Sequence, residues 1–385
     1  MLGDDDSRLN EASDIRTGQA PDLLQLGSPN MTGLAALRSR WADMPMIPKV
    51  VHDRNQGIDN SWPGFDLRTL LVGEESAGRF TVHDVIVAPA ARLPPHHVNL
   101  SDTYLCVLDG ELDLTVGGRT EVTRTDGFAY VPENTTFALH NRSALPARIF
   151  LWHAPAGPER AFAAAHRLSS ERPEAKPEDF YLALASLGFV FHDDGESLSN
   201  DRRTNERGAR LKMRVETFAD FAAMREAWAH QAPTPKLVQD RSVERDIAVP
   251  GQDTKVLLSG EESGARAVVM HYGIMPGYRA PEHHQPSEEE IFLVLEGTLD
   301  LRVGNVTTEL GRGGFGFAPR YATHGFSNPA PQGQARTITI NSPAGHERAF
   351  EMVVREGLSE RLPGLLVAHG WRFHRAAHTA AHTAD

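Results

Sequence analysis

The chain has 385 residues, of which 40% are hydrophobic and 23% are charged, a composition typical of a globular protein with two or three domains. Its formal net charge of −12 disfavours electrostatic binding to nucleic acid or to an anionic membrane surface. No apolar run is long enough to cross a bilayer, the N-terminal residues lack the apolar core of a signal peptide, and the single cysteine, Cys106, has no partner for an internal disulfide. We therefore expect a cytoplasmic protein that binds neither nucleic acid nor membrane.

An internal repeat with an offset of 187 residues organises the chain. The segment LLVGEESAGR begins at Leu70 and LLSGEESGAR begins at Leu257, and the same offset relates ELDLTVGG at Glu111 to TLDLRVGN at Thr298. Such a repeat indicates a duplicated domain. The pattern predicts five consecutive regions: a polar N-terminal extension (1–32), an N-terminal domain (33–165), a linker of helices and loop (166–219), a C-terminal domain (220–352), and a C-terminal helix with a mobile tail (353–385).

Each copy consists mainly of short segments that are rich in β-branched and aromatic residues, many of them separated by glycine-containing turns. In chain order, the first copy holds RFTVHDVIV, TYLCVLDGELDLTVGG, FAYVP and ARIFLWH, and the second holds AVVMHYGIM, EIFLVLEGTLDLRVG, GFGFAP and ARTITIN. Helical spacing is found in PERAFAAAHRLSS and PEDFYLALASLGFVF between the copies, and in FADFAAMREAWAHQ before the second copy. The sequence predicts an all-β protein with two tandem barrels and short flanking helices.

Two motifs in the second copy resemble those of the cupin superfamily. GYRAPEHHQPSEEEIFLVLEG, from Gly277 to Gly297, and GGFGFAPRYATHGFSN, from Gly313 to Asn328, have the family's spacing of glycine, histidine, glutamate, proline and asparagine. The resemblance implies that both barrels are jelly rolls, so that the chain is a bicupin. The strand before the first motif and the PAG-x-ERAF block at the end of each copy most resemble the bicupin group around quercetin 2,3-dioxygenase.

The same resemblance implies a metal site in the second copy. Its ligand positions are His283, Gln285, Glu290 and His324, and such a nitrogen and oxygen set suits one divalent transition metal, Fe, Mn, Co, Ni or Zn. The family has a second histidine where this chain has Gln285. Gln285 is then either a weak ligand or a donor beside a site of two histidines and one carboxylate, or else His284 turns inward at a β-bulge and takes its place.

The first copy has lost most of these ligands. His96 occupies the position of His283, but the other three ligand positions hold Val98, Thr103 and Phe137. We therefore expect a first barrel that holds no metal and serves packing or pairing. An alternative site in this copy would combine His97, Asp102 and His140, although three residues separate His140 from Phe137 and place it on the opposite face of a regular strand.

Other candidate residues belong to the core, the tail or the pocket. Cys106 aligns with Leu293 in an apolar strand and is expected in the core. The tail has three histidines at helical spacing that could bind a metal from solution, although we expect this segment to be frayed: His374, His378 and His382. Aromatic residues gather around the second motif, and four of them are predicted to line a pocket for a planar substrate: Phe292, Phe317, Tyr321 and Phe326.

These features favour an enzyme with its chemistry in the second barrel. The resemblance implies a metal-dependent oxygenase that uses O2 on an aromatic or enolisable molecule such as a flavonol or a polyketide, with Glu290 accepting a substrate proton. A non-redox cyclase or isomerase would use the same pocket, with the metal polarising a carbonyl. A third hypothesis is a bicupin that binds a small molecule without catalysis. Since jelly-roll faces commonly pair, we also predict a homodimer.

Overall fold

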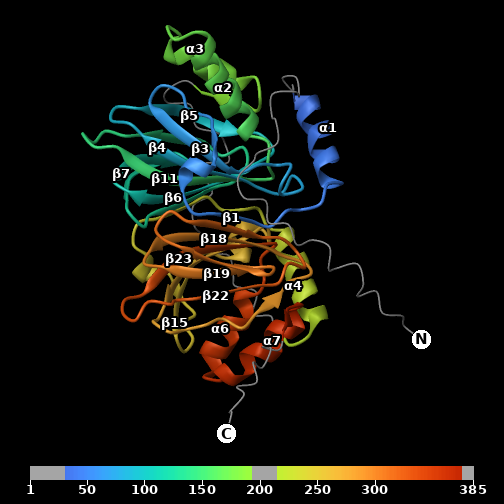
Figure 1. Cartoon of the computed structure of the whole chain (residues 1–385). Coiled ribbons are helices and arrows are strands. Elements are labelled where there is room, and N and C mark those ends of the chain that lie inside the picture. The colour runs from blue at the N-terminus through green and yellow to red at the C-terminus, as the bar shows by residue number, and fades with distance from the viewer. Residues whose placement is uncertain (1–30, 193–214, 375–385) are drawn as a thin grey trace.

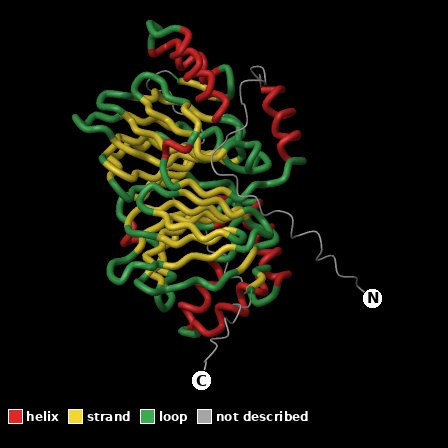
Figure 2. Tube along the Cα trace, in the orientation of Figure 1, coloured by secondary structure: helices red, strands yellow, loops and turns green. Residues whose placement is uncertain are grey.

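The computed structural model describes residues 31–192 and 215–374, and the predicted N-terminal extension, His378 and His382 lie outside these ranges. Figure 1 shows two β-rich bodies stacked on one another, with the N-terminal half in blue to green and the C-terminal half in yellow to red. Strands form both bodies, and the helices lie at their periphery (Figure 2). The predicted fold class, two tandem jelly-roll barrels with short flanking helices, is therefore confirmed.

Each barrel consists of one seven-stranded and one five-stranded antiparallel sheet. In the first barrel the sheet orders are β13-β9-β6-β11-β4-β3-β2 and β12-β5-β10-β7-β8. The bounds are β2 (Ile58–Asp59), β3 (Phe65–Leu71), β4 (Thr81–Val87), β5 (Arg92–Val98), β6 (Asp102–Asp109), β7 (Glu111–Val116), β8 (Arg119–Arg124), β9 (Phe128–Val131), β10 (Phe137–His140), β11 (Ala147–Ala154), β12 (Phe189–Phe191) and β13 (Lys236–Val238).

The second barrel repeats this arrangement, with sheet orders β1-β21-β18-β23-β16-β15-β14 and β20-β19-β22-β17-β24. Its strands are β1 (Lys49–Val51), β14 (Arg245–Asp246), β15 (Gln252–Leu258), β16 (Val268–Ile274), β17 (His283–His284), β18 (Glu289–Glu296), β19 (Leu299–Val303), β20 (Val306–Leu310), β21 (Phe315–Ala318), β22 (His324–Ser327), β23 (Ala335–Ser342) and β24 (Arg372–Phe373). The α-helices in the described ranges are α1 (Met31–Ala42), α2 (Glu159–Glu171), α3 (Pro177–Ala185), α4 (Phe218–Ala229), α5 (Gly260–Ser263), α6 (Glu347–Glu356) and α7 (Leu362–His369).

The two barrels exchange one strand each. β1 precedes the first barrel in the chain but pairs with β21 of the second, and β13 precedes the second barrel but pairs with β9 of the first. The predicted boundaries at 33 and 220 assigned each strand to its own barrel, and the structure corrects this. The two strands have closely related sequences, PKVVHDR and PKLVQDR, so each fits the edge of the other copy.

The repeated unit also extends further than the sequence indicated. Within the predicted linker 166–219, β12 pairs with β5, and within the predicted tail, β24 pairs with β17. The expected helix over PEDFYLALASLGFVF ends at Ala185, since Gly188 has φ +107° and the chain then enters β12. Each barrel is therefore completed by a pair of helices and a returning strand.

The described residues form three large hydrophobic clusters and a small one around Trp41. One fills each barrel, and the third lies between the two large sheets, where Phe80 of the first barrel meets Phe317 of the second at a ring separation of 6.4 Å. Cys106 lies in this third cluster with no exposed surface, which confirms its predicted place in the core. Since alternate residues of a strand face opposite sides of a sheet, the strands of each large sheet present one face to the barrel interior and the other to the partner barrel.

Candidate metal centre

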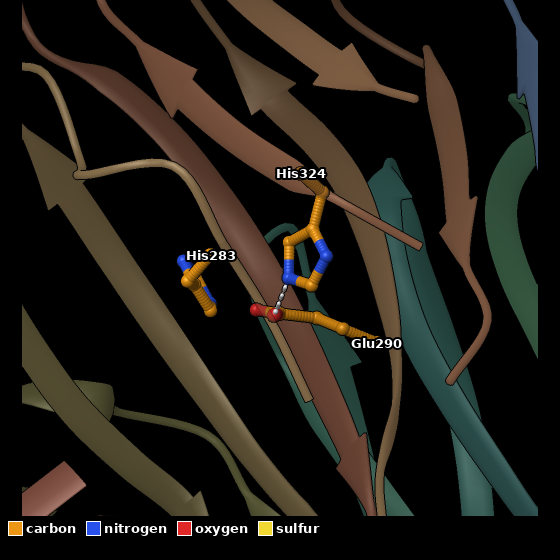
Figure 3. A group of neighbouring side chains, drawn as sticks. All are labelled: His283, Glu290 and His324. Carbon is orange, nitrogen blue, oxygen red and sulfur yellow. Dashed lines mark hydrogen bonds and ion pairs between the residues drawn. The ribbon is translucent and has the colours of Figure 1, made fainter. Parts of the chain in front are cut away.

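Three side chains from three strands converge inside the second barrel. His283 comes from β17, Glu290 from β18 and His324 from β22, and Figure 3 shows them turned toward one another. One ligand atom of each lies within 4.8 Å of the others, which is close to twice the usual metal–ligand distance of about 2.0–2.2 Å. All three residues are at most 3% exposed. The triad thus forms a closed, water-shielded donor set.

Backbone carbonyls fix the tautomer of both imidazoles. His283 Nδ1 donates to the carbonyl of Pro281 at 2.9 Å, and His324 Nδ1 donates to the carbonyl of Ala322 at 2.8 Å. In a neutral ring this leaves Nε2 with its lone pair free to bind a metal. Burial, together with the neighbouring His324, lowers the pKa of His283 well below its usual value, so this ring is neutral at pH 7.

The inner atoms of the triad fit a bound cation. His324 Nε2 lies 3.0 Å from Glu290 Oε2 (Figure 3), so either a shared proton or a metal ion can bridge these two atoms. Within the described part of the chain, His283 Nε2 is buried without a hydrogen-bond partner. Since buried polar atoms are normally satisfied, these atoms fit a divalent metal.

The structure separates the two candidates for the fourth position. Gln285 is 1% exposed, and neither atom of its amide has a partner among the described residues. His284 lies outside the triad, because its Nδ1 contacts His374 Nε2 at 2.8 Å. The arrangement in which His284 replaces Gln285 is therefore not the one adopted.

A tryptophan that the sequence did not single out supports the triad. Trp371 stacks on His283 with ring centroids 4.0 Å apart and an interplanar angle of 4°. It precedes β24 in the segment predicted as a tail. The signal for it was the likeness of GFVFH, ending at His192, to GWRFH, ending at His374, at an offset shortened to 182 residues.

Behind Trp371 lies a buried polar cluster that the sequence did not reveal. Glu288 receives a hydrogen bond from Arg225 and lies 3.2 Å from His369 Nε2 and 3.5 Å from His346 Nδ1. Burial alone would raise the pKa of Glu288, but His369, His346 and Arg225 lower it to about 2. A Glu-Glu-Glu run that could have been a solvated surface is thus fully buried, since Glu288, Glu289 and Glu290 are each at most 3% exposed.

The four aromatic residues predicted to line a pocket lie in three different environments. Phe292 and Phe326 lie in the interior cluster of the second barrel, as expected. Phe317 faces the first barrel instead, because on β21 the residues that point inward are Gly316 and Ala318. Tyr321 is 59% exposed, with a left-handed φ of +65° in the turn before β22. The prediction that Phe317 and Tyr321 line the pocket is therefore wrong.

The first barrel does not assemble a comparable triad from its described residues. His96 keeps the hydrogen bond to the carbonyl of Pro94, at 2.8 Å, but its ring packs against Phe137 at 5.5 Å. The alternative set does not converge either, since His97 contacts His192 and Asn99, while Asp102 forms an ion pair with Arg266 of the second barrel. Apolar side chains surround a residual cavity of about 20 Å³ beside His96.

A family model described as "Cupin domain" matches residues 83–153 and 270–341. The chain therefore carries two cupin domains. Among the residues that the structure describes, no helix is long and apolar enough to span a membrane. No curated protein matches the chain.

Solved structures with resembling folds include three proteins of low sequence identity. A putative glyoxylate-induced protein from Pseudomonas aeruginosa is 15% identical, with 72% of this chain and 80% of that chain covered and a TM-score of 0.46. A mutant salicylate 1,2-dioxygenase from Pseudoaminobacter salicylatoxidans is 13% identical, with 73% of each chain covered and a TM-score of 0.43. Oxalate decarboxylase from Bacillus subtilis is 13% identical, with 87% and 90% covered and a TM-score of 0.48. The functional argument therefore rests on the residues of the two cupin domains of this chain.

Proposed function

We propose that the protein is a metal-dependent oxygenase whose C-terminal cupin domain oxidises an enolisable small molecule with O2. The observation that carries this proposal is the convergence of His283, Glu290 and His324, whose ligand atoms lie within 4.8 Å of one another, with His283 Nε2 left without a hydrogen-bond partner among the described residues. Two histidines and one carboxylate with open positions are the donor set typical of non-haem Fe(II) oxygenases.

The residues of the site would have separate roles in metal binding, in ligand orientation and in proton transfer. His283, Glu290 and His324 would hold the ion, which supplies a Lewis acid that lowers the pKa of a bound hydroxyl and, if it is iron, redox chemistry with O2. The backbone hydrogen bonds at each Nδ1 keep both imidazoles in the ligating tautomer. The second oxygen of the Glu290 carboxylate remains available to accept the proton of the substrate hydroxyl. Burial of the triad excludes bulk water, which strengthens each of these electrostatic interactions.

Metal content and oxygen uptake test the proposal. Purified protein is loaded anaerobically with Fe2+, Mn2+, Co2+, Ni2+ or Zn2+, and O2 consumption is followed with acetylacetone as a compact enolisable probe. We expect about one ion per chain, O2 uptake that depends on the metal, and a decrease of about 100-fold or more in kcat for Glu290→Gln. A matched Thr103→Ala variant in the first cupin domain should leave uptake unchanged.

Each alternative has its own result in this experiment. Conversion of the probe by the Zn2+-loaded protein without O2 consumption would replace the oxygenase by a cyclase or isomerase. Metal retention without turnover would favour a binding protein. Failure of the wild-type protein to retain any of the five ions would contradict the proposal as a whole.

A further inference from the structure

The inward face of the second barrel is polar beside the triad. On β23, Ile338 and Ile340 belong to the cluster between the barrels, so the alternate residues Thr337, Thr339 and Asn341 face the barrel interior. The strand register places Asn341 directly opposite Glu290. Each of the three inward residues is at most 1% exposed.

Two buried primary amides of the second barrel, one of them opposite Glu290, leave their hydrogen-bonding groups unused. In the ranges that the structure describes, neither Nδ2 nor Oδ1 of Asn341 has a partner, and the same holds for Nε2 and Oε1 of Gln285. The indole Nε1 of Trp371, which stacks on His283, is likewise buried and unpaired there. A buried amide that is left unpaired is destabilising, so these groups indicate a polar occupant of the barrel.

A hydrogen-bonded polar group continues this surface away from the triad. Gln252 Nε2 donates to Thr254 Oγ1 at 3.1 Å, and Thr254 lies opposite Tyr272 on β16. Tyr272 is buried, and its hydroxyl donates to Met270 Sδ at 3.8 Å. Hydroxyl and amide groups therefore extend over three adjacent strands, β15, β16 and β23.

The first barrel has hydrocarbon at the same positions. Gln252, Thr254 and Tyr272 correspond to Phe65, Leu67 and Val85 at the offset of 187 residues, and Thr337 and Thr339 correspond to Ile149 and Leu151 after a slip of one residue. These five counterparts all belong to the apolar core of the first barrel. His153, at the position of Asn341, is the polar exception, so the hydroxyl groups are a property of the barrel with the triad and not a requirement of the fold.

We propose, on the basis of the function proposed above, that the substrate is a compact, oxygen-rich molecule whose hydroxyl groups are recognised by Asn341 and Gln285. A hydroxyl both donates and accepts a hydrogen bond, which complements a primary amide. None of the described residues buried in the second barrel is a lysine or an arginine, so the site has no side-chain counter-ion for a polyanion. Burial on all sides favours a molecule of a few carbons over a flat polycyclic ring. Asn341 is the specificity-determining residue of this proposal.

Ligand binding to the cobalt-loaded protein tests this inference without any turnover. The probes are L-glycerate, L-lactate, which lacks the 3-hydroxyl group, and benzoate, and the readouts are the Co2+ visible spectrum and the rise in Tm. Because one hydrogen bond to the extra hydroxyl corresponds to about a tenfold difference in Kd, we expect glycerate to bind about tenfold more tightly than lactate, and benzoate to bind most weakly. In Asn341→Leu the glycerate-to-lactate ratio should fall to about one, with unchanged cobalt binding. The matched variant His153→Leu, at the corresponding position of the first barrel, should keep the ratio of the wild type.

The outcomes separate this inference from the proposed function. Failure of the wild-type protein to bind cobalt would contradict the proposed function. Three results with normal cobalt binding would overturn the inference alone. The protein could bind benzoate most tightly, it could bind none of the probes, or Asn341→Leu could still prefer glycerate to lactate. A more stable Asn341→Leu protein with unchanged ligand affinities would also overturn it, since the amide would then be paired only with internal water.

Discussion

The two cupin domains of this chain have the same strands in the same order, but the side chains inside the two barrels differ in polarity. The first is filled with aromatic and aliphatic side chains, whereas the second presents a ligand triad, two unpaired amides and a group of hydroxyls. Their outer faces, by contrast, are equally apolar and pack together, with Trp152 of β11 and Ile340 of β23 in one cluster. The comparison shows that one face of a strand can diverge completely while the other continues to hold the molecule together, because successive residues point to opposite sides.

The two domains also differ in the polar contacts of two equivalent arginines. Arg38 and Arg225 occupy equivalent positions, and each donates from Nε to a backbone carbonyl, of Ala156 at 2.6 Å and of Ala344 at 2.7 Å. Arg38 then bonds the hydroxyl of Ser101, whereas Arg225 bonds the carboxylate of Glu288. A neutral contact in the first domain has thus become part of a buried charged cluster next to the triad in the second.

The largest effect on metal binding is expected when one ligand of the second domain is replaced by its counterpart from the first. His324→Phe copies Phe137 and should weaken metal binding about 1,000-fold or more, because it removes one of three ligands and fills the site with an apolar ring. The reverse change, Phe137→His, should create no site, since Val98 and Thr103 remain. Calorimetric titration with Co2+ measures both. Tight cobalt binding by His324→Phe would contradict the claim that the second domain binds metal through its triad.

Removing the equivalent arginines should have unequal costs. Arg225→Ala leaves the buried Glu288 carboxylate without its cation, and we expect a loss of about 3–5 kcal/mol in the free energy of unfolding. Arg38→Ala deprives only neutral acceptors of a donor and should cost about 1–2 kcal/mol. Urea unfolding of both variants provides the comparison. Equal losses in the free energy of unfolding would show that the charge of Glu288 does not make the second domain more dependent on its arginine.

The ion pairs that join the domains should also differ. Arg266 reaches across to Asp102 at 2.5 Å and to Glu133 at 3.0 Å, and Asp102 is only 2% exposed. Its counterpart Arg79 lies 3.7 Å from Glu289, which already pairs with Arg320. We therefore expect a cost of about 1–3 kcal/mol for Arg266→Ala and below about 0.5 kcal/mol for Arg79→Ala in thermal or urea unfolding. A larger loss for Arg79→Ala would contradict this asymmetry.

An effect that is absent at neutral pH and grows with acidity concerns the first domain. Burial, with the neighbouring His96, lowers the pKa of His153 to about 3, so the folded protein keeps this ring neutral while the unfolded chain protonates it below about pH 6.5. Its contribution is therefore complete above pH 6.5 and is lost as the pH falls from 6.5 toward 3. His153→Leu should reduce the slope of unfolding free energy against pH by about 1.4 kcal/mol per pH unit in this range.

A control residue distinguishes this effect from a general loss of charge. His230 has a side chain that is 73% exposed, and His230→Gln should leave the slope unchanged. Parallel curves for His153→Leu and the wild-type protein would show that His153 is protonated in the folded state.

The positions of the triad residues could be predicted from sequence because the two motifs of the second copy resemble those of the cupin superfamily, which implies a ligand at each of these positions. The structure brings His283, Glu290 and His324 within 4.8 Å of one another, as the resemblance implied. The aromatic pattern around the second motif misplaced Phe317, because β21 presents its two phenylalanines to the other barrel and its small residues to the interior. Strand period alone does not say which face is inside.

Other features depended on contacts between distant segments. The exchange of β1 and β13 was hidden because the two strands are nearly interchangeable in sequence, and only tertiary packing decides which edge each one joins. Trp371 was hidden because the repeat shortens by five residues before β24. Asn341 was hidden because a lone asparagine in a strand carries no signal until its neighbour Glu290 and its unpaired amide are seen together.

The most direct test of the contrast between the two domains is an anomalous difference map from crystals grown with Co2+ and measured at the cobalt edge. The account predicts a single strong peak per chain, between His283 Nε2, Glu290 and His324 Nε2, and no peak beside His96 in the first domain. A peak in the first domain, or a cobalt ion bound by His284 and His374 with none in the triad, would contradict it.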